Sequence, residues 1–475
     1  MFRKKMLSLL TAALVFFGIF GGVEASALTF TPTNGTDAEG EPVPISFYSR
    51  SIYMINAATG EAIVDINSEE KISPGYLNQL MTCALVLDKF GGNEKKLKNT
   101  YTYGDNTCFD DLYDTGAPTA DIRPFEEVSY YDLLVSMILV SSCEAANIAG
   151  ADIAGSPYDF VMMMNEKAQE LGMENTKFTT PHGNSTVQNY TTAADMTKLC
   201  RYIINNYSIY CEIAQFELYQ LEATETHEEG TTLYNNNYLV TQQSDYYYSS
   251  VKGLKSSVHD SCGRSLASYA TYDGSGYIAV SLGAPIEKTA ADVKKGEQNP
   301  NSIYGYDYVY YSLLDHIHLF DWAFNSLVMT DFINPNSEIT DALVEFGLEA
   351  DYVNLKPKSS YQMLWPYDLP IEDVEKKVTV YKNIIAPIEE NDVLGKMELI
   401  YNNEVIASVD LISTSSVSRS KSASELKIAG SFFRSNEFRW AVFLMIMVVT
   451  IYSVSFFVFL QLKYLKVNKK KKKKA

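Results

Sequence analysis

The side chains that could perform chemistry gather in a few short segments of the chain. The run Ser141-Ser142-Cys143-Glu144 follows an apolar stretch, and Lys255 is followed by Ser256 in a second segment. An ammonium group beside a hydroxyl group suits a carboxylate ligand, so Lys255 and Ser256 are candidate substrate-binding residues. A nucleophilic serine or cysteine also needs an adjacent base. The spacing identifies no such base–nucleophile pair.

The sequence predicts neither a metal site nor a cofactor. No two of the cysteines form a close C-x-x-C motif, which argues against zinc or redox chemistry and leaves the disulfide pairing open. His316 and His318 are two positions apart on an expected helix, so they point to different faces and are poor joint ligands. The cysteines are Cys83, Cys108, Cys143, Cys200, Cys211 and Cys262.

The elements that must position these residues follow an α+β order. Residues 51–56 and 61–66 alternate as two strands around a turn, and residues 265–271 and 277–282 flank the turn Asp273-Gly274-Ser275-Gly276. Helical spacing of apolar residues separates the two hairpins. This order predicts an antiparallel sheet with helices on its faces. The expected helices span residues 77–90, 130–155, 157–172, 192–206 and 306–327.

The helical spacing stops near residue 330. Short apolar runs between polar turns predict a small all-β module over 331–412. The Ser-rich stretch that follows predicts a linker over 413–438. Residues 439–463 predict one transmembrane helix, because the run Trp440–Leu462 carries no charge and is long enough to cross a bilayer.

The two ends of the chain predict its location. Residues 1–27 resemble a signal peptide with an Ala-x-Ala cleavage site, a retained anchor being the alternative, and 28–45 are expected to form a flexible lead-in. The lysine-rich tail, 464–475, predicts a cytoplasmic C-terminus of a single-pass membrane protein, and its lysines could also attract anionic lipids. The remainder is strongly acidic, since the whole chain carries a net charge of −19, which argues against nucleic-acid binding.

The segment from Ser51 to Asp88 resembles the start of the penicillin-sensitive serine D-Ala-D-Ala carboxypeptidases. That family carries Pro-Ala-Ser-x-x-Lys-x-Met-Thr after its first hairpin, and this chain reads Pro74-Gly75-Tyr76-Leu77-Asn78-Gln79-Leu80-Met81-Thr82. The alignment needs no gap. It places Tyr76 at the position of the family's catalytic serine and Gln79 at the position of its lysine.

Further motifs follow in the family's order. Ser141 keeps the serine of a Ser-x-Asn motif while Cys143 replaces its asparagine, and Lys255 with Ser256 resembles the start of Lys-Thr-Gly without the glycine. Pro181-His182-Gly183 and the neighbouring segments also match. The resemblance covers residues 46–412. It implies a β-lactamase/transpeptidase-like domain over 46–330, followed by the family's membrane-proximal β domain.

The substitutions imply a pseudoenzyme. Gln79 stays neutral and cannot take a proton, while the phenol of Tyr76 projects past the position of a serine hydroxyl. Losing the nucleophile of a comparable enzyme lowers turnover by about 10⁶-fold, and Ser141 with Lys255 would not restore it. The simpler, non-catalytic interpretations are that Tyr76 fills the former active site, that Cys143 is a small buried hydrophobic residue, and that His182 has a structural role.

Two alternatives stay open. One is an active serine-type carboxypeptidase with a relocated nucleophile, for which Ser73 is the nearest candidate. The other is protein–protein interaction through the β module. As a pseudoenzyme, the chain is expected to bind a peptidoglycan stem peptide or to scaffold a cell-wall enzyme.

Overall fold

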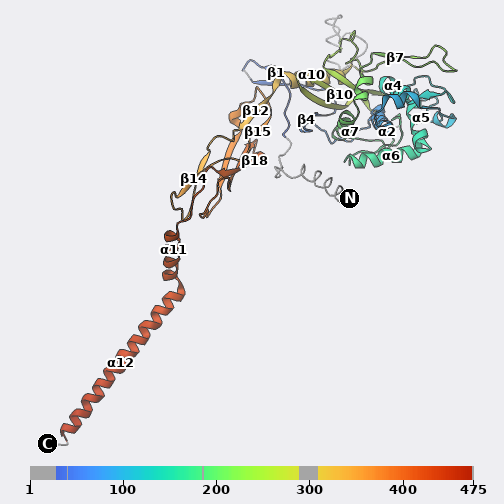
Figure 1. Cartoon of the computed structure of the whole chain (residues 1–475). Coiled ribbons are helices and arrows are strands. Elements are labelled where there is room, and N and C mark those ends of the chain that lie inside the picture. The colour runs from blue at the N-terminus through green and yellow to red at the C-terminus, as the bar shows by residue number, and fades with distance from the viewer. Residues whose placement is uncertain (1–27, 40, 185–186, 288–308, 473–475) are drawn as a thin grey trace, which may run out of the picture. The chain divides into compact units, whose positions relative to one another are not determined.

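The computed structural model describes residues 28–39, 41–184, 187–287 and 309–472. The predicted signal peptide, 1–27, and the end of the lysine tail lie outside these residues. The described chain divides into two compact units, each shown in Figure 1 and described here by itself. The first comprises Ser26–Met329 with Leu364–Pro370, and the second comprises Thr330–Met363 with Ile371–Ala475.

An antiparallel sheet of five strands forms the centre of the first unit. Every neighbouring pair in it is antiparallel, which confirms the predicted fold class. The two sequence-predicted hairpins supply its strands β3, β4, β10 and β11. In spatial order the strands are β4 (Ala62–Ile66), β3 (Ser51–Asn56), β11 (Ser275–Ala284), β10 (Gly263–Tyr272) and β9 (Val251–His259).

Helices cover both faces of this sheet. On one face, His316 of α10 (Tyr311–Ser326) is hydrogen-bonded to Ser281, at 3.0 Å, and to Ser268. Burial lowers the pKa of His316 to about 3, so its neutral imidazole serves as a link between two serine hydroxyls. Adjacent strand residues point the other way. Ala267 and Val280 accordingly belong to the main hydrophobic core on the opposite face.

The main core surrounds α2 (Gln79–Phe90), which is apolar on most sides and almost wholly buried. A helix that is apolar all round is stable only when other elements enclose it. The first turn of α2 is therefore fixed in the interior. The other helices of the unit are α3 (Glu94–Asn99), α4 (Tyr130–Val140), α5 (Cys143–Ala154), α6 (Pro157–Glu170), α7 (Ala193–Asn206) and α8 (Ser208–Ala214). Short elements are η1 (Gly75–Asn78), η2 (Asn106–Cys108), β5 (Tyr101–Thr102), β6 (Val128–Ser129), β7 (Leu218–Gln220) and β8 (Thr232–Tyr234).

The expected single helix over 130–155 is wrong, because the chain breaks between α4 and α5. Ser141 ends α4 with a left-handed backbone (φ 61°), and Ser142 starts α5 by accepting a hydrogen bond from the amide of Ala145 at 3.2 Å. Serine is a strong N-cap residue, and this signal was present in the sequence. The break turns the Ser141 backbone out of the helix axis and toward α2.

The lead-in over 28–45 is more ordered than expected. It contains the paired strands β1 (Thr33–Thr36) and β2 (Pro42–Pro44). The buried ring of Phe30 meets Trp365 edge-on, with ring centroids 5.5 Å apart. The segment Leu364–Pro370 thus packs with the first unit, although the sequence analysis assigned it to the β module.

The second unit holds a separate antiparallel β sheet of five strands, as the sequence predicts for this region. Alternate residues of its central strands are buried, among them Met397, Leu399 and Leu411. Their order is β13 (Thr340–Leu343), β14 (Tyr352–Pro357), β18 (Glu404–Ser413), β17 (Val393–Tyr401) and β16 (Glu375–Val380). Strands β12 (Leu327–Ile333) and β15 (Tyr361–Pro366) each contain residues of both units, and η4 (Ile371–Asp373) belongs to the second unit.

Two helices follow the β sheet. The structure places α11 (Lys421–Arg434) where the sequence analysis expected an irregular linker, and its sequence contains many residues of good helix propensity. Helix α12 (Asn436–Lys472) includes a stretch, Asn436–Lys466, that is long and apolar enough to cross a membrane, and its apolar window has no buried residues. This helix is the one candidate membrane span among the described residues.

The turn at 180–183 is held directly against the start of α2. Thr82 donates its hydroxyl hydrogen to the carbonyl of Pro181 at 2.6 Å, and the Asn78 amide donates to the carbonyl of Thr180 at 3.2 Å. Gly183 has φ +83°, and a Cβ atom there would overlap the carbonyl oxygen of Gly75. Only glycine fits this backbone conformation and this close approach.

Replacing Gly183 with alanine should therefore destabilise the first unit by about 2–4 kcal/mol, since a backbone atom cannot move aside as a flexible side chain can. Gly155→Ala is the matched control, because Gly155 has φ +89° but open space around it. The control should cost only about 1 kcal/mol from backbone strain. Denaturant unfolding of the full chain in detergent would compare the two. Equal losses would contradict the proposed contact.

Candidate functional site

Tyr76 lies in η1, at the entrance to α2, and its ring is buried. Its backbone N–H donates to the hydroxyl of Ser257 on β9 at 3.0 Å, and its phenol donates to the side-chain oxygen of Asn184 at 3.0 Å. The ring lies beside His259, with centroids 5.5 Å apart, and the residue is only 6% exposed. Burial is the main cause that raises the pKa of Tyr76 well above its ordinary value. The phenol therefore stays neutral and fills the space between η1, β9 and residue 184.

Gln79 is the first residue of α2 and lies one turn after Tyr76. It is fully buried. Its amide nitrogen lies within hydrogen-bond distance of the carbonyl oxygens of Ser141 (2.9 Å), Ser142 (3.4 Å) and His182 (3.2 Å). The carboxamide thus joins three segments, namely the start of α2, the α4–α5 junction and the 180–183 turn. A carboxamide does this without taking up or releasing a proton.

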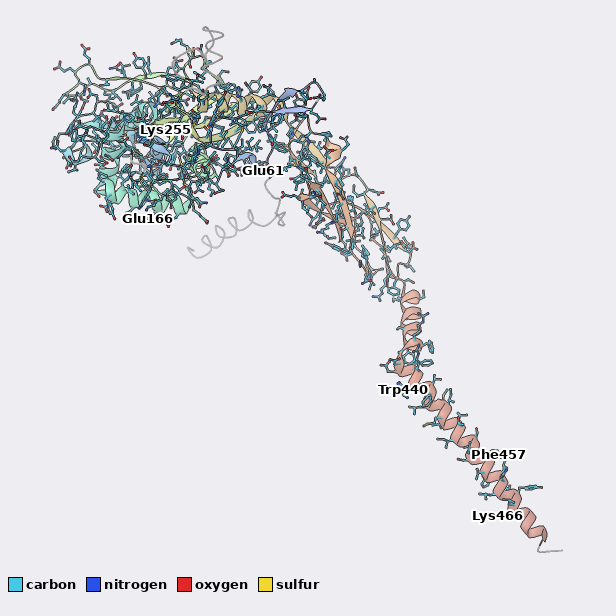
Figure 2. The ribbon with its side chains drawn as sticks, turned by 180° about the vertical axis from the view of Figure 1, so that it is seen from behind. Glu61, Glu166, Lys255, Trp440, Phe457 and Lys466 are labelled. Carbon is cyan, nitrogen blue, oxygen red and sulfur yellow. The ribbon has the colours of Figure 1, made fainter. Side chains whose placement is uncertain are left out.

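Lys255 lies in the middle of β9, inside the first unit (Figure 2). It is fully buried, and its ammonium nitrogen lies 2.5 Å from the carbonyl oxygen of Met137 and 3.0 Å from the hydroxyl oxygen of Ser141. Burial lowers the pKa of Lys255 to about 8. The sequence analysis recognised no base–nucleophile pair, and the structure does bring this amine and this hydroxyl together.

The hydroxyl of Ser141 is nevertheless poorly placed for attack. A hydroxyl oxygen has two lone pairs, and that of Ser141 accepts from Lys255 and, at 3.3 Å, from the amide of Asn236. The residue is only 1% exposed. A nucleophile needs a lone pair directed at its substrate and a base that takes its proton. The pair instead resembles a buried ammonium held by neutral oxygen acceptors.

The remaining predicted residues surround this centre. Cys143 is buried at the first position of α5, and burial raises the pKa of its thiol well above the ordinary value, so the thiol stays protonated. Ser256 is nearly buried beside Lys255 on β9. Lys255 is fully buried and its ammonium has two acceptors inside the protein, so carboxylate binding by Lys255 and Ser256 stays a prediction. Ser73, the expected rescue candidate, lies before η1 and next to Cys262.

His182 has a defined structural role. The amide of Asn184 donates to its Nδ1 at 3.0 Å, so the proton resides on Nε2, which donates to Asp111 at 3.0 Å. Burial acts to raise the pKa of Asp111, but hydrogen bonds from His182 and Asn147 prevail and lower it. Asp111 also accepts from Asn147 of α5 at 3.0 Å. These contacts tie the 180–183 turn to α5.

Sequence reasoning missed several partners in this site. Ser257 and Asn184 both hydrogen-bond Tyr76, and Asn236 hydrogen-bonds Ser141. Asn184 directly follows Pro181-His182-Gly183, so its position offered a signal. Asn236 lies in an irregular segment without a pattern, and only the folded chain brings it to the site.

Comparisons with known proteins agree along most of the chain. A family model described as D-alanyl-D-alanine carboxypeptidase matches residues 37–286, and one described as penicillin-binding protein 5, C-terminal domain, matches residues 329–419. The D-alanyl-D-alanine carboxypeptidase DacF of Bacillus subtilis is 24% identical over 383 residues, which cover 80% of this chain and 89% of the relative. DacC of Escherichia coli is 24% identical over 391 residues, covering 81% and 87%.

Solved structures share the fold. The D-alanyl-D-alanine carboxypeptidase DacD from Francisella tularensis has a TM-score of 0.59 at 18% identity, covering 84% of this chain and 99% of the other. Penicillin-binding protein 5 from Haemophilus influenzae has a TM-score of 0.53 at 21% identity, covering 79% and 99%. At these identities the likeness shows the penicillin-binding-protein fold, consistent with the sheet and helices described above.

The buried Lys255 makes a testable contribution to stability. Since its folded-state pKa, about 8, is below the ordinary 10.5, the unfolded chain binds more protons between these values. The free energy of unfolding should therefore rise with pH across that window, relative to Lys255→Met, by about 1.4 kcal/mol per pH unit. Denaturant titrations of both proteins from about pH 7 to 10 would measure the difference. A difference that stays constant with pH would contradict the buried, depressed lysine.

Proposed function

This chain belongs to the family of D-alanyl-D-alanine carboxypeptidases, and we propose that it is a non-catalytic member that serves the peptidoglycan layer from the cell membrane. The family acts on the cell wall, and its stem peptides define the chemical setting. The observation that carries the proposal is the buried phenol of Tyr76, which occupies the entrance to α2 where the family has its nucleophile. No substrate carbonyl can occupy the space that this ring fills.

Gln79 supports the same conclusion. Its carboxamide is engaged with backbone carbonyls one turn from Tyr76, where the family has the lysine that takes the nucleophile's proton. A site without both groups loses about 10⁶-fold in turnover, which corresponds to about 8 kcal/mol of activation free energy. The three-way contact made by Gln79 keeps the surrounding segments in place without that chemistry. Such a domain is suited to a scaffold role beside another cell-wall enzyme.

Helix α12 supports membrane anchoring. We infer a single-pass topology with both folded units outside the cytoplasm, because lysines cluster directly after the apolar stretch and mark the cytoplasmic side. Trp440, at the start of that stretch, suits a membrane–water interface.

One observation favours a second candidate function. Lys255 has a pKa of about 8, so above this pH its neutral amine could accept a proton from the Ser141 hydroxyl 3.0 Å away. An active carboxypeptidase with Ser141 as a relocated nucleophile would then operate at alkaline pH. The burial of Ser141 and its contact with Asn236 argue against this candidate.

Incubation with a fluorescent penicillin separates the two candidates. The full chain in detergent should remain unlabelled at about pH 7 and at about pH 9, because the Tyr76 ring fills the proposed nucleophile position and the Ser141 hydroxyl is buried. A family member with an intact Ser-x-x-Lys motif serves as the positive control. Covalent labelling that appears at alkaline pH and disappears in Ser141→Ala would establish the relocated nucleophile and overturn the proposal.

Binding of a stem peptide ending in D-Ala-D-Ala tests whether Tyr76 closes the cleft. Calorimetric titration should show no saturable binding to the wild type or to Tyr76→Phe, which keeps the ring. Tyr76→Ala, which removes the ring, should gain binding. Equal binding by the wild type and Tyr76→Ala, or binding by neither, would contradict the proposal that the Tyr76 ring closes the site.

A further inference from the structure

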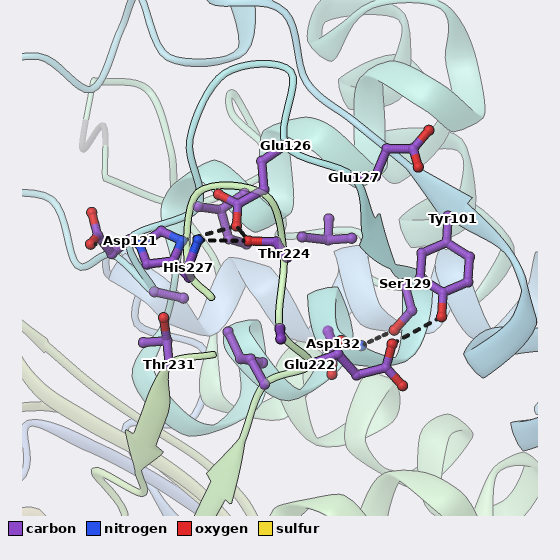
Figure 3. Close-up of a pocket in the computed structure, with 15 residues that line it drawn as sticks. Tyr101, Asp121, Glu126, Glu127, Ser129, Asp132, Glu222, Thr224, His227 and Thr231 are labelled. Carbon is purple, nitrogen blue, oxygen red and sulfur yellow. Dashed lines mark hydrogen bonds and ion pairs between the residues drawn. The ribbon is translucent and has the colours of Figure 1, made fainter. Parts of the chain in front are cut away.

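A small cavity of about 30 Å³ lies apart from Tyr76 and Lys255 (Figure 3). One side of it is the segment 118–126, which precedes α4. The other side is the loop region 218–234 around β7 and β8, which is called the excursion. Its walls are rich in carboxylates, and His227 is the titratable base among them. The ionisable side chains that line it are Tyr101, Asp121, Glu126, Glu127, Asp132, Glu222 and His227.

His227 bridges the two sides of this cavity. Its Nδ1 lies 3.0 Å from a carboxylate oxygen of Glu126, and its Nε2 lies 3.1 Å from a carboxylate oxygen of Asp121. A carboxylate only accepts hydrogen bonds, and a neutral imidazole has only one N–H group. Both contacts can therefore be hydrogen bonds only when both ring nitrogens carry a proton. The two carboxylates thus favour the imidazolium ion, whereas the Thr226 hydroxyl, 3.2 Å from Nδ1, is a donor for the neutral ring.

The surrounding charges favour that ion. Arg123 pairs with the far side of Asp121 at 2.7 Å and is the nearby competing cation. Glu127, Asp132 and Glu222 face the cavity from the other walls, and Glu225, Glu228 and Glu229 lie on the same excursion as His227. Burial raises the pKa of Asp132 to about 6, which leaves it largely ionised at neutral pH. The hydrogen bond to Glu126, followed by that to Asp121, raises the pKa of His227.

Thr224 reinforces the same link. Its hydroxyl is hydrogen-bonded to the Glu126 oxygen that faces His227, and its Oγ1 also accepts from the backbone N–H of His227 at 3.1 Å. Two residues of the β7–β8 excursion therefore converge on one carboxylate of the opposite segment.

The segment 118–126 also contacts the start of α5, which lies next to the candidate site. Glu144 of α5 accepts from the hydroxyl of Thr119 and from the amide of Ala120, both at 2.7 Å. The amide of Cys143 donates to the carbonyl of Pro118 at 2.9 Å. Residues 118–126 thus connect the start of α5 at one end with His227 at the other.

We propose that His227 is a proton-controlled latch. In its doubly protonated form it fastens the excursion over residues 218–234 to residues 118–126, and when it loses a proton one of its two hydrogen bonds is lost and the excursion is released. This inference concerns the regulation of the fold and holds whether or not the protein is catalytic.

The direction of the pH dependence follows from the raised pKa. A histidine whose folded-state pKa exceeds its ordinary value of 6.5 contributes its full stabilisation below that value and loses it as the pH rises through the folded-state pKa. The latch should therefore be closed in mildly acidic conditions and open in alkaline conditions.

Hydrogen–deuterium exchange of the full chain in detergent tests the latch. After correction for the intrinsic exchange rate, protection of residues 218–234 should fall about tenfold between about pH 5.5 and pH 8, as local opening becomes easier. Peptides from β9, β10 and β11 should keep their protection and report that the unit remains folded. His227→Gln should show the low protection at both pH values.

Two further variants complete the experiment. Glu126→Gln removes one carboxylate partner, so the transition should move to lower pH. His318→Gln on α10 is the matched control for the loss of a histidine elsewhere and should behave as the wild type. A wild-type excursion whose protection does not change with pH, or a His227→Gln protein that keeps the wild-type pH dependence, would overturn the latch.

Discussion

The carboxamide of Gln79 is the contact on which the geometry of the candidate site depends. It joins α2, the α4–α5 junction and the 180–183 turn through backbone carbonyls. An ammonium group at this position could reach the same oxygens, but it would share Ser141 with Lys255. Two like charges buried together disfavour each other's charged forms. The neutral amide keeps the three-way junction and leaves Lys255 without a second lysine beside it.

The burial of the Lys255 ammonium group is unfavourable for the stability of the fold. Desolvating an ammonium ion takes several kcal/mol, and the hydrogen bonds of Lys255 go to neutral oxygens of Met137 and Ser141. A core designed only for stability would place an apolar residue here. The lysine, the left-handed Ser141 and the broken helix therefore form a costly arrangement of the kind found at functional sites, and Gln79 contacts it directly.

The sequence predicted the antiparallel sheet because both hairpins carry strong turn signals close to their strands. The resemblance also singled out Gln79, Ser141 and Lys255, which lie close together in the fold, while their roles stay predictions. The contact between Ser141 and Lys255 was out of reach, because it joins residues far apart in the chain whose approach depends on how α4 packs against β9. The complete burial of Lys255 was out of reach for the same reason, since burial cannot be inferred from one strand.

The N-terminus of α5 contacts both the Gln79 junction and the segment that leads to His227. On one side, the Ser142 carbonyl just before this helix lies within reach of the Gln79 amide, so the α2 side of the cleft is fixed by a group that does not titrate. On the other side, Cys143 and Glu144 hydrogen-bond residues 118–120. The same segment continues to Glu126, which contacts His227, a group that does titrate. A change of pH at His227 therefore acts on one side of the α5 N-terminus and leaves the Gln79 contacts on the other side in place.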